Sequence, residues 1–363
     1  RVSQPEGPPM RFIPDKLHLP SFGLTLALGA VGGLAAQALH LPLPMLLGPL
    51  LVVAGVALGQ WRPLGHPVQF PMRLRQIFVP IIGVSIGGNF TPDILAEAGQ
   101  WWPSLLALAL FIPVAHVISF RAVRATGLVD PVTAFFGTAP GGLIETVQMG
   151  EERGGDPAML TMLQFLRLIV TLVAVPIFFS VMTGHLVGSA GGASLSRAPM
   201  SAADLPWLIG AGVLGGVIGW RLKLPGGMVT GPILISAIVH LSGLAQGNPP
   251  GWLVNATQVV IGVSLGVRFA GMPLGRFWLA IRLAGLSTAL SIGLAAICAI
   301  GLARVVAEPP AAVFLAFAPG GLIEMSLIAL SLQMSVVYVT AHHALRILLA
   351  VAVARGLAPR LAK

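Results

Sequence analysis

The sequence predicts an all-α integral membrane protein with two inverted five-span repeats, each with an extra re-entrant segment broken at Pro-Gly-Gly. Three observations lead to this fold class. The 363-residue chain is 56% hydrophobic and only 9% charged, whereas soluble chains average about 25% charged residues. Landmarks of the first half recur in register in the second half, and the distribution of basic residues favours re-entrant motif segments.

Apolar runs separated by Pro, Gly and charged residues define twelve candidate segments. Several of them reach or approach the roughly 20 apolar residues that cross a bilayer. The segments lie near 20–39, 43–60, 76–90, 101–120, 130–149, 157–183, 205–222, 226–245, 254–271, 281–303, 309–333 and 335–357. We therefore expect a tail at 1–20, a first membrane repeat at 21–184, a linker at 185–204, a second repeat at 205–357 and a tail at 358–363.

Four sequence landmarks of the first half return in the second half in the same order. Ala-Pro-Gly-Gly-Leu-Ile-Glu occupies both 139–145 and 318–324, and an Arg follows each Glu by 22 residues. Gly-Val-Ser-x-Gly occurs at 83–87 and 262–266, and Leu-Pro-x-x-Met-x-x-Gly-Pro at 41–49 and 224–232. The register shift is 179 residues for all but the last pair, for which it is 183. Such agreement indicates an internal duplication.

The basic residues decide between two topologies. If all twelve segments span, 13 of the 19 Lys and Arg outside the two motif-linked arginines lie on the cytoplasmic side. If segments 130–149 and 309–333 instead enter and leave on one side, that number becomes 17. The second topology obeys the positive-inside rule better. It gives each half an odd number of spans, so the halves face opposite ways, as in many transporters.

The repeated motif predicts an interrupted helix in each half. Pro140 and Pro319 lack a backbone donor, and the paired glycines that follow (Gly141, Gly142, Gly320 and Gly321) add backbone freedom. Non-helical backbone at membrane depth is tolerated where it is buried in protein or lines a wet cavity. Its N–H groups bind anions and its carbonyls bind cations. A Pro-kinked packing helix is the alternative interpretation.

Four charged residues are expected deep in the membrane, at Glu145, Arg167, Glu324 and Arg346. Each costs roughly 2.5–3.5 kcal/mol at the bilayer centre, so we expect Glu145 to pair with Arg167 and Glu324 with Arg346. These pairs are either structural salt bridges or a site in which Arg binds an anionic substrate while Glu carries a proton or helps to hold a cation. Gln164 and His343 lie three residues before the two arginines and complete the candidate site.

Other site chemistries have little support in the sequence. Cys298 is the single cysteine, which excludes disulfides and thiolate clusters. The eight histidines are dispersed except for His342 and His343, so we expect no metal site and no cofactor. The net charge of +9 is scattered between apolar runs, which argues against nucleic-acid binding.

The paired Ala-Pro-Gly-Gly-Leu-Ile-Glu motifs, the duplication and the Gly-Pro repeats resemble the AbrB-type bacterial membrane family. The resemblance covers about residues 22–357. This family is often labelled ammonia monooxygenase, or regulator of the gene for that enzyme. The resemblance implies a transporter-like protein of the inner membrane, and it supplies no catalytic residues.

We therefore expect a secondary transporter of a small solute, with an anion favoured by the arginines and with coupling to a proton or Na+. Both termini are expected to be cytoplasmic, and the oligomeric state, including a homodimer, stays open. The alternative function is a membrane-embedded regulator or sensor that affects gene expression indirectly. An oxygenase is disfavoured, because the histidines do not cluster.

Overall fold

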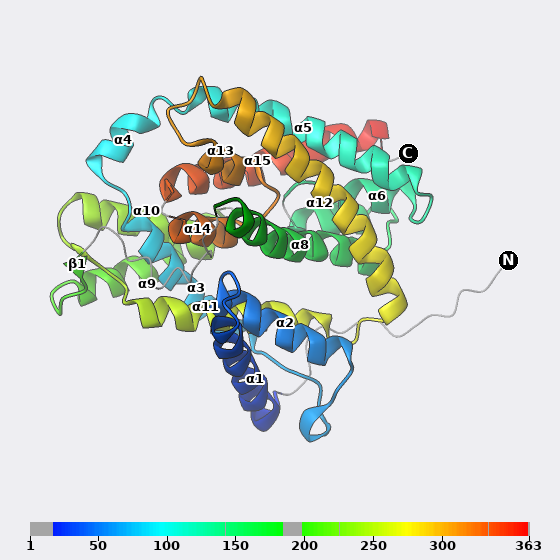
Figure 1. Cartoon of the computed structure of the whole chain (residues 1–363), viewed down its shortest axis with the longest axis horizontal. Coiled ribbons are helices and arrows are strands. Elements are labelled where there is room, and N and C mark those ends of the chain that lie inside the picture. The colour runs from blue at the N-terminus through cyan, green and yellow to red at the C-terminus, as the bar shows by residue number, and fades with distance from the viewer. Residues whose placement is uncertain (1–16, 142, 184–197, 225, 333, 362–363) are drawn as a thin grey trace.

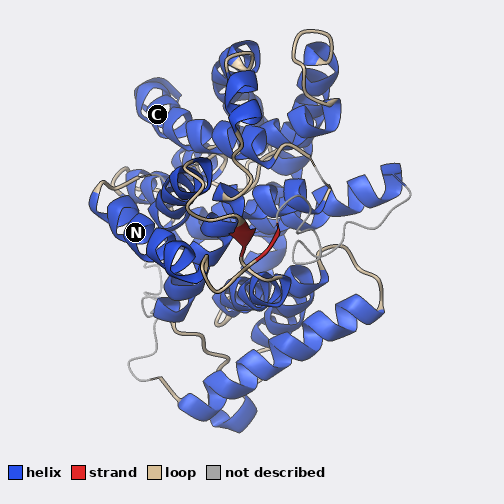
Figure 2. Ribbon diagram, turned by 90° about the vertical axis from the view of Figure 1, so that its left-hand side faces the viewer, coloured by secondary structure: helices blue, strands red, loops and turns tan. Residues whose placement is uncertain are grey.

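The computed structural model describes residues 17–141, 143–183, 198–224, 226–332 and 334–361 (Figure 1). Helices form most of this part of the chain, and its only strands are two very short ones (Figure 2). The first-half helices are α1 (Leu19–Ala38), α2 (Pro44–Leu58), α3 (Met72–Gly87), α4 (Pro92–Ala98), α5 (Trp102–Ala125), α6 (Pro131–Gly137), α7 (Leu143–Glu151) and α8 (Pro157–Thr183). The second-half helices are α9 (Leu205–Arg221), α10 (Gly227–Leu241), α11 (Gly251–Gly266), α12 (Leu274–Leu302), α13 (Pro310–Phe317), α14 (Leu322–Ser331) and α15 (Val336–Leu361).

The lengths of the helices fit a membrane protein. Six helices of the described chain are long and apolar enough to cross a bilayer, namely α1, α5, α8, α11 with its 3-10 extension Val267–Phe269, α12 and α15. Four shorter apolar helices, α2, α9, α10 and α14, accompany them. Helices α3 and α4 form a seventh candidate span that is bent by 81°. The predicted all-α membrane class is confirmed, whereas α4 was not predicted and the number of spans stays a prediction.

One group of helices brings the two halves of the chain together through small residues. Helices α1 and α2 pack closely, as do α9 and α10, and each pair also receives a helix from the other half. Gly83 of α3 lies against the backbone of Val229 in α10, and Gly262 of α11 lies against the backbone of Leu46 in α2. A Cβ at either glycine would collide with a carbonyl oxygen. These glycines, which the sequence analysis found as a repeated motif, therefore permit close helix contact.

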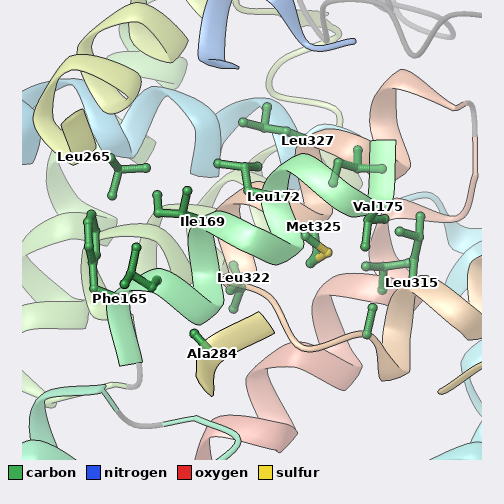
Figure 3. Packing of buried hydrophobic residues seen from close by; sticks show 14 of the residues in the cluster. Phe165, Ile169, Leu172, Val175, Leu265, Ala284, Leu315, Leu322, Met325 and Leu327 are labelled. Carbon is green, nitrogen blue, oxygen red and sulfur yellow. The ribbon is translucent and has the colours of Figure 1, made fainter. Parts of the chain in front are cut away.

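A second group contains α5–α8 and α12–α15 and surrounds a hydrophobic core. Helix α8 runs through its centre, beside α14 (Figure 1). Phe165, Ile169, Leu172 and Val175 of α8 line this core together with Leu315 of α13, Leu322 of α14 and other residues (Figure 3). The two broken segments, α6–α7 and α13–α14, both belong to this group. They are held by α8 and α15, the helices that follow them in the chain.

A small polar contact closes one edge of the first group. Strands β1 (Ala198–Pro199) and β2 (Gly247–Asn248) pair in parallel. Asp204 accepts hydrogen bonds from the Ser201 hydroxyl (2.7 Å), the Ser201 N–H (2.8 Å) and the Gln246 N–H (2.9 Å). The hydrogen bond from the Ser201 hydroxyl, followed by that from Gln246, holds the pKa of Asp204 well below its usual range.

Candidate functional site

Both copies of the repeated motif interrupt a helix, as the sequence predicts. Helix α6 ends at Gly137 and α7 begins at Leu143, whereas α13 ends at Phe317 and α14 begins at Leu322. Gly142 of the first motif lies outside the described residues. The two interruptions, which we call the first break (138–141) and the second break (318–321), leave backbone groups without helical partners.

Side chains of α8 satisfy the carbonyls of the first break. The Arg167 guanidinium donates to the carbonyl oxygen of Ala139 and, at 3.5 Å, to that of Thr138. The Gln164 amide donates to the carbonyls of Phe136 (2.6 Å) and Ala139 (3.1 Å), and its oxygen accepts from Arg167 (2.9 Å). The α8 residues therefore cap the carbonyl end of α6, where the helix dipole favours a positive charge.

Side chains of α15 hold the second break in the same way. The Arg346 guanidinium donates to the carbonyl oxygens of Ala318 and Gly320. His343 Nε2 bonds the carbonyl of Leu315 at 2.9 Å, which is the position equivalent to Phe136 in the first copy. Gln164 and His343 thus have equivalent roles, although one is an amide and the other an imidazole.

The predicted pairing of Glu145 with Arg167 and of Glu324 with Arg346 is wrong. Among the residues that the structure describes, the side-chain ion pair joins Arg276 to Asp156 instead. Arg167 and Arg346 donate to backbone carbonyls instead, because the C-terminal ends of α6 and α13 present several unpaired carbonyls within reach of the two guanidiniums. The free carbonyls at each break need donors of their own, which complementary charge alone does not reveal.

The two glutamates lie in the first turns of α7 and α14, where a helix favours a negative charge. Their environments differ. Glu145 is exposed, which contradicts the expectation of a buried acid, whereas Glu324 is 9% exposed. The Glu324 carboxylate folds back over Gly321, where it fills the space that a Cβ would need. The positive charge that attracts it belongs to Arg75 of α3.

The two breaks lie close to each other in the second helix group. A Cβ on Gly141 would reach the Ala350 Cβ at 3.0 Å and the Arg346 carbonyl oxygen at 3.8 Å. The Arg167 and Arg346 guanidiniums are near enough to repel each other. They are 5% and 3% exposed, and the Nε atom of each has no hydrogen-bond partner. Two buried like charges with free donors favour an anion near the breaks.

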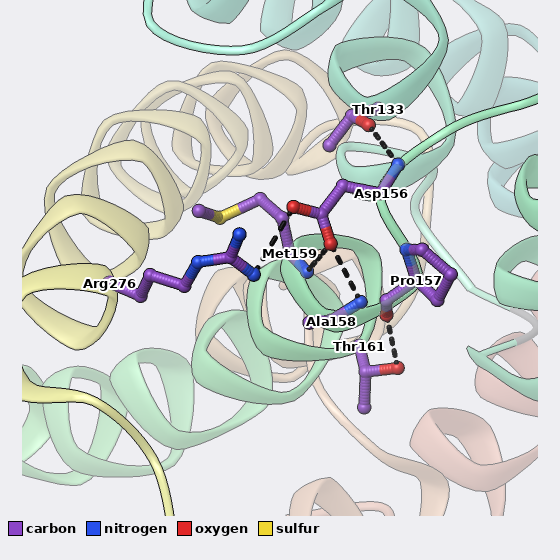
Figure 4. A network of polar contacts seen from close by, with 7 residues as sticks. All are labelled: Thr133, Asp156, Pro157, Ala158, Met159, Thr161 and Arg276. Carbon is purple, nitrogen blue, oxygen red and sulfur yellow. Dashed lines mark hydrogen bonds and ion pairs between the residues drawn. The ribbon is translucent and has the colours of Figure 1, made fainter. Parts of the chain in front are cut away.

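Further polar contacts in this helix group were not predicted. Asp156 accepts from the N–H groups of Ala158 (3.0 Å) and Met159 (3.1 Å), and its second oxygen lies 3.3 Å from Arg276 (Figure 4). Its own N–H donates to Thr133 of α6 (2.8 Å). The signal for this cap was available, since an Asp directly before Pro157 is a typical helix start. Its contact with Arg276 of α12 requires the tertiary structure.

A second unpredicted cluster surrounds the start of α15. Ser104 of α5 lies 2.9 Å from His342 Nε2, and His342 Nδ1 bonds the Tyr338 carbonyl at 2.8 Å. The histidine pair therefore does not share a ligand, because His343 points to α13 while His342 points to α5. In the described part of the chain, no three His, Cys, Asp or Glu side chains gather as a metal site would require.

The comparisons with known proteins agree with this picture at the level of the family. A family model described as "Transition state regulatory protein AbrB" matches residues 62–362. An Escherichia coli protein named "Putative regulator AbrB" is 27% identical over 90% of this chain and 92% of its own length. A Bacillus subtilis protein named "Uncharacterized protein YhjN" is 25% identical over 90% of this chain and 89% of its own. Neither name denotes an enzyme.

Proposed function

Since the chain belongs to the AbrB family and is built from apolar helices, we propose that it is a secondary transporter of a small anion in the bacterial inner membrane. The observation that carries the proposal is the pair of buried guanidiniums at the two breaks. Each arginine has an unpartnered Nε, and neither is neutralised by a carboxylate among the described residues. An anion would relieve the mutual repulsion of Arg167 and Arg346.

The site residues of this proposal are those of the breaks and their supports. The breaks supply backbone N–H groups at the starts of α7 and α14, where the helix dipoles favour anions. Gln164 and His343 fix the carbonyl ends, so that the arginines stay oriented. The set is Pro140, Gly141, Gly142, Gln164, Arg167, Pro319, Gly320, Gly321, His343 and Arg346, with Glu145 and Glu324 as the acids at the helix starts.

The helix arrangement supports alternating access about two inverted repeats. The group with α1–α3 and α9–α11 has a glycine-lined interior, whereas the group with α5–α8 and α12–α15 holds both breaks. We propose ten spans with α6–α7 and α13–α14 as re-entrant elements and with both termini cytoplasmic, in agreement with the positive-inside count. One group then moves against the other around the anion.

The test is anion flux in proteoliposomes, with acetate, succinate, sulfate and inorganic phosphate as labelled probes. Wild-type protein should exchange at least one of them, and Arg346→Gln should lower that exchange at least tenfold. Arg276→Gln is the matched control, because it removes an arginine that lies outside the site and is partly exposed. Absence of flux for every probe, or equal flux in Arg346→Gln, would contradict the proposal.

A regulator is the second candidate, because the Escherichia coli relative is named a regulator. A membrane-embedded sensor would bind its effector at the same breaks without carrying it across. Binding of a probe anion, seen as a raised unfolding temperature in detergent, together with no exchange in proteoliposomes, would favour this candidate over the transporter.

A further inference from the structure

The imidazole of His343 is hydrogen-bonded on one side only. Its Nε2 donates to the Leu315 carbonyl at 2.9 Å, because a carbonyl oxygen can only accept. In the neutral ring the proton therefore sits on Nε2, and Nδ1 carries a lone pair. This Nδ1 atom is buried and has no hydrogen-bond partner among the residues that the structure describes. The second break thus has an open acceptor next to Arg346.

Gln164, at the equivalent position of the first copy, uses both ends of its amide. It donates to two backbone carbonyls, and its oxygen accepts from Arg167 at 2.9 Å. The corresponding amino group of Arg346 donates to the Gly320 carbonyl instead. The arginine of the second copy therefore leaves the Nδ1 atom of His343 unbound, whereas the arginine of the first copy occupies the matching oxygen.

The charged groups next to His343 are cationic. Arg346 lies three residues further along α15 and so on the same face, and the first break adjoins, since a Cβ on Gly141 would lie 3.8 Å from the Arg346 carbonyl oxygen. Helices α6 and α13, which pack on α15, contain no ionisable residue. The helix itself and the others packed on it bring further ionisable groups near the breaks, and these are His342, His116, Arg75, Glu145 and Glu324. A further positive charge on Nδ1 is therefore opposed while the site is empty.

We infer that Nδ1 of His343 is the proton-binding site that couples the transported anion to a proton. The inference rests on the proposed function and names the proton as its second substrate. A bound anion offsets the charges of Arg167 and Arg346, and it thereby favours the imidazolium form of His343. Proton and anion then bind together, and each raises the affinity for the other by the same factor.

The proton balance of one transport cycle is simple. Nδ1 takes a proton from water on the side to which the breaks are open, and a new N–H bond forms while Nε2 keeps its bond to Leu315. On the opposite side the anion leaves, the repulsion from the arginines returns, and the Nδ1–H bond breaks to release the proton to water. The ring ends neutral, and one proton has crossed with one anion.

His116 is the rival candidate, because its ring is bound in a similar way. Its Nε2 bonds the Phe135 carbonyl at 2.9 Å, and its Nδ1 has no partner among the described residues. The ring packs on the Phe135 side chain at 4.4 Å and comes from α5, not from the helix that carries an arginine of the breaks. We therefore assign the proton to His343, and His116 serves as the matched control.

The open acceptor can be tested without any transported anion. Nitrogen-15 NMR of the full chain in lipid nanodiscs, with labelled histidine, distinguishes a neutral ring protonated on Nε2 from one protonated on Nδ1. The signal of His343 is identified by its loss in His343→Gln, and we expect the Nε2–H form. An Nδ1–H form would overturn the inference, because no lone pair would then remain at that atom.

Coupling is tested in proteoliposomes that contain a pH-sensitive dye, with labelled acetate, succinate, sulfate and phosphate and with protein-free liposomes as the blank. The wild-type protein should take up about one proton with each anion of every probe that it transports. His343→Gln can still donate to Leu315 but has no basic nitrogen, so the ratio of protons to anions should fall at least tenfold, whatever anion flux remains. His116→Gln should keep the wild-type ratio.

The outcomes separate this inference from the proposed function. Anion uptake by the wild-type protein without protons would overturn the inference and leave the transporter in place, and this result needs no variant to fold. An unchanged ratio in His343→Gln, or a loss of protons in His116→Gln alone, would also overturn it. No uptake of any probe by the wild-type protein would instead refute the proposed function, and the coupling would fall with it.

Discussion

The starts of α8 and α15 occupy equivalent places in the two copies of the repeat, yet different chemistry holds them. At the start of α8, Asp156 caps the helix and binds Arg276, while its backbone ties it to Thr133. At the start of α15 the equivalent residue is Ser335, and the residue equivalent to Arg276 is Glu97. A fixed ion pair therefore stands opposite a set of acids and hydroxyls. The duplication preserved the position of the helix start, but at α15 acidic and hydroxyl side chains take the place of the ion pair.

The breaks themselves show the opposite tendency. Arg167 and Arg346 both bind the carbonyl that precedes the motif proline, and Gln164 and His343 both bind the carbonyl three residues earlier. Both copies have therefore kept the same side-chain support of the broken backbone. The difference between the copies lies at the starts of α8 and α15.

The largest expected effect comes from removing the arginine supports. Arg346→Ala leaves the carbonyls of Ala318 and Gly320 without donors, and hydrogen bonds to charged groups contribute about 1.5–3 kcal/mol each. Arg167→Ala should cost less, because Gln164 still donates to Ala139. Unfolding midpoints in detergent measure both losses, and equal destabilisation would show that the two breaks are held alike.

Exchanging the helix caps tests the comparison at the helix starts. Asp156→Ala should destabilise by about 1 kcal/mol through loss of the cap, whereas Asp156→Ser should recover most of this because a serine also caps α15 at this position. The reverse change, Ser335→Asp, places a carboxylate beside Glu308 and should destabilise. Thermal unfolding measures all three, and a stabilising Ser335→Asp would mean that the acids there are not negatively charged.

The pH dependence of stability distinguishes the start of α15, where Glu308 contacts Ser335, from the start of α8. Because burial raises the pKa of Glu308 in the fold, the folded state binds more protons than the unfolded state between the ordinary and the raised pKa. The Glu308 contribution to stability is therefore fully present at low pH and is lost as pH rises through this window. Glu308→Gln should flatten this slope in unfolding measurements across pH, and a slope equal to that of wild type would contradict the assignment.

The smallest effect on stability is expected from removing Arg276, the more exposed partner of the Arg276–Asp156 ion pair. Arg276 and Asp156 are 49% and 36% exposed, and such pairs contribute about 0–1 kcal/mol. Arg276→Ala should therefore lower the unfolding midpoint only slightly, and less in high salt. A loss as large as that of Asp156→Ala would show that the ion pair, and not the cap, fixes the start of α8.

The sequence was sufficient for the helices and the breaks, because both depend on local properties. Apolar runs bounded by Pro and Gly located α1, α2, α8 and α9 within a few residues, and Pro140 and Pro319 marked the interruptions. The side-chain partners were not predictable in this way. Complementary charge suggested that Glu145 should pair with Arg167. In the structure the Arg167 guanidinium donates instead to the free carbonyl of Ala139 at the first break and to the side-chain oxygen of Gln164. The Ser104–His342 contact joins residues that are 238 positions apart in the chain, and no periodic pattern in the sequence predicts it.

The crossed packing of α3 on α10 and of α11 on α2 has a consequence for biosynthesis. The face of α2 that packs against the α11 glycines stays uncovered until α11 leaves the ribosome, roughly 200 residues later. At about 5–20 residues per second, that interval is roughly 10–40 s. During it the early helices must be shielded by lipid or by the insertion machinery, so a gene cut at the linker should yield two fragments that are degraded alone and survive only when made together.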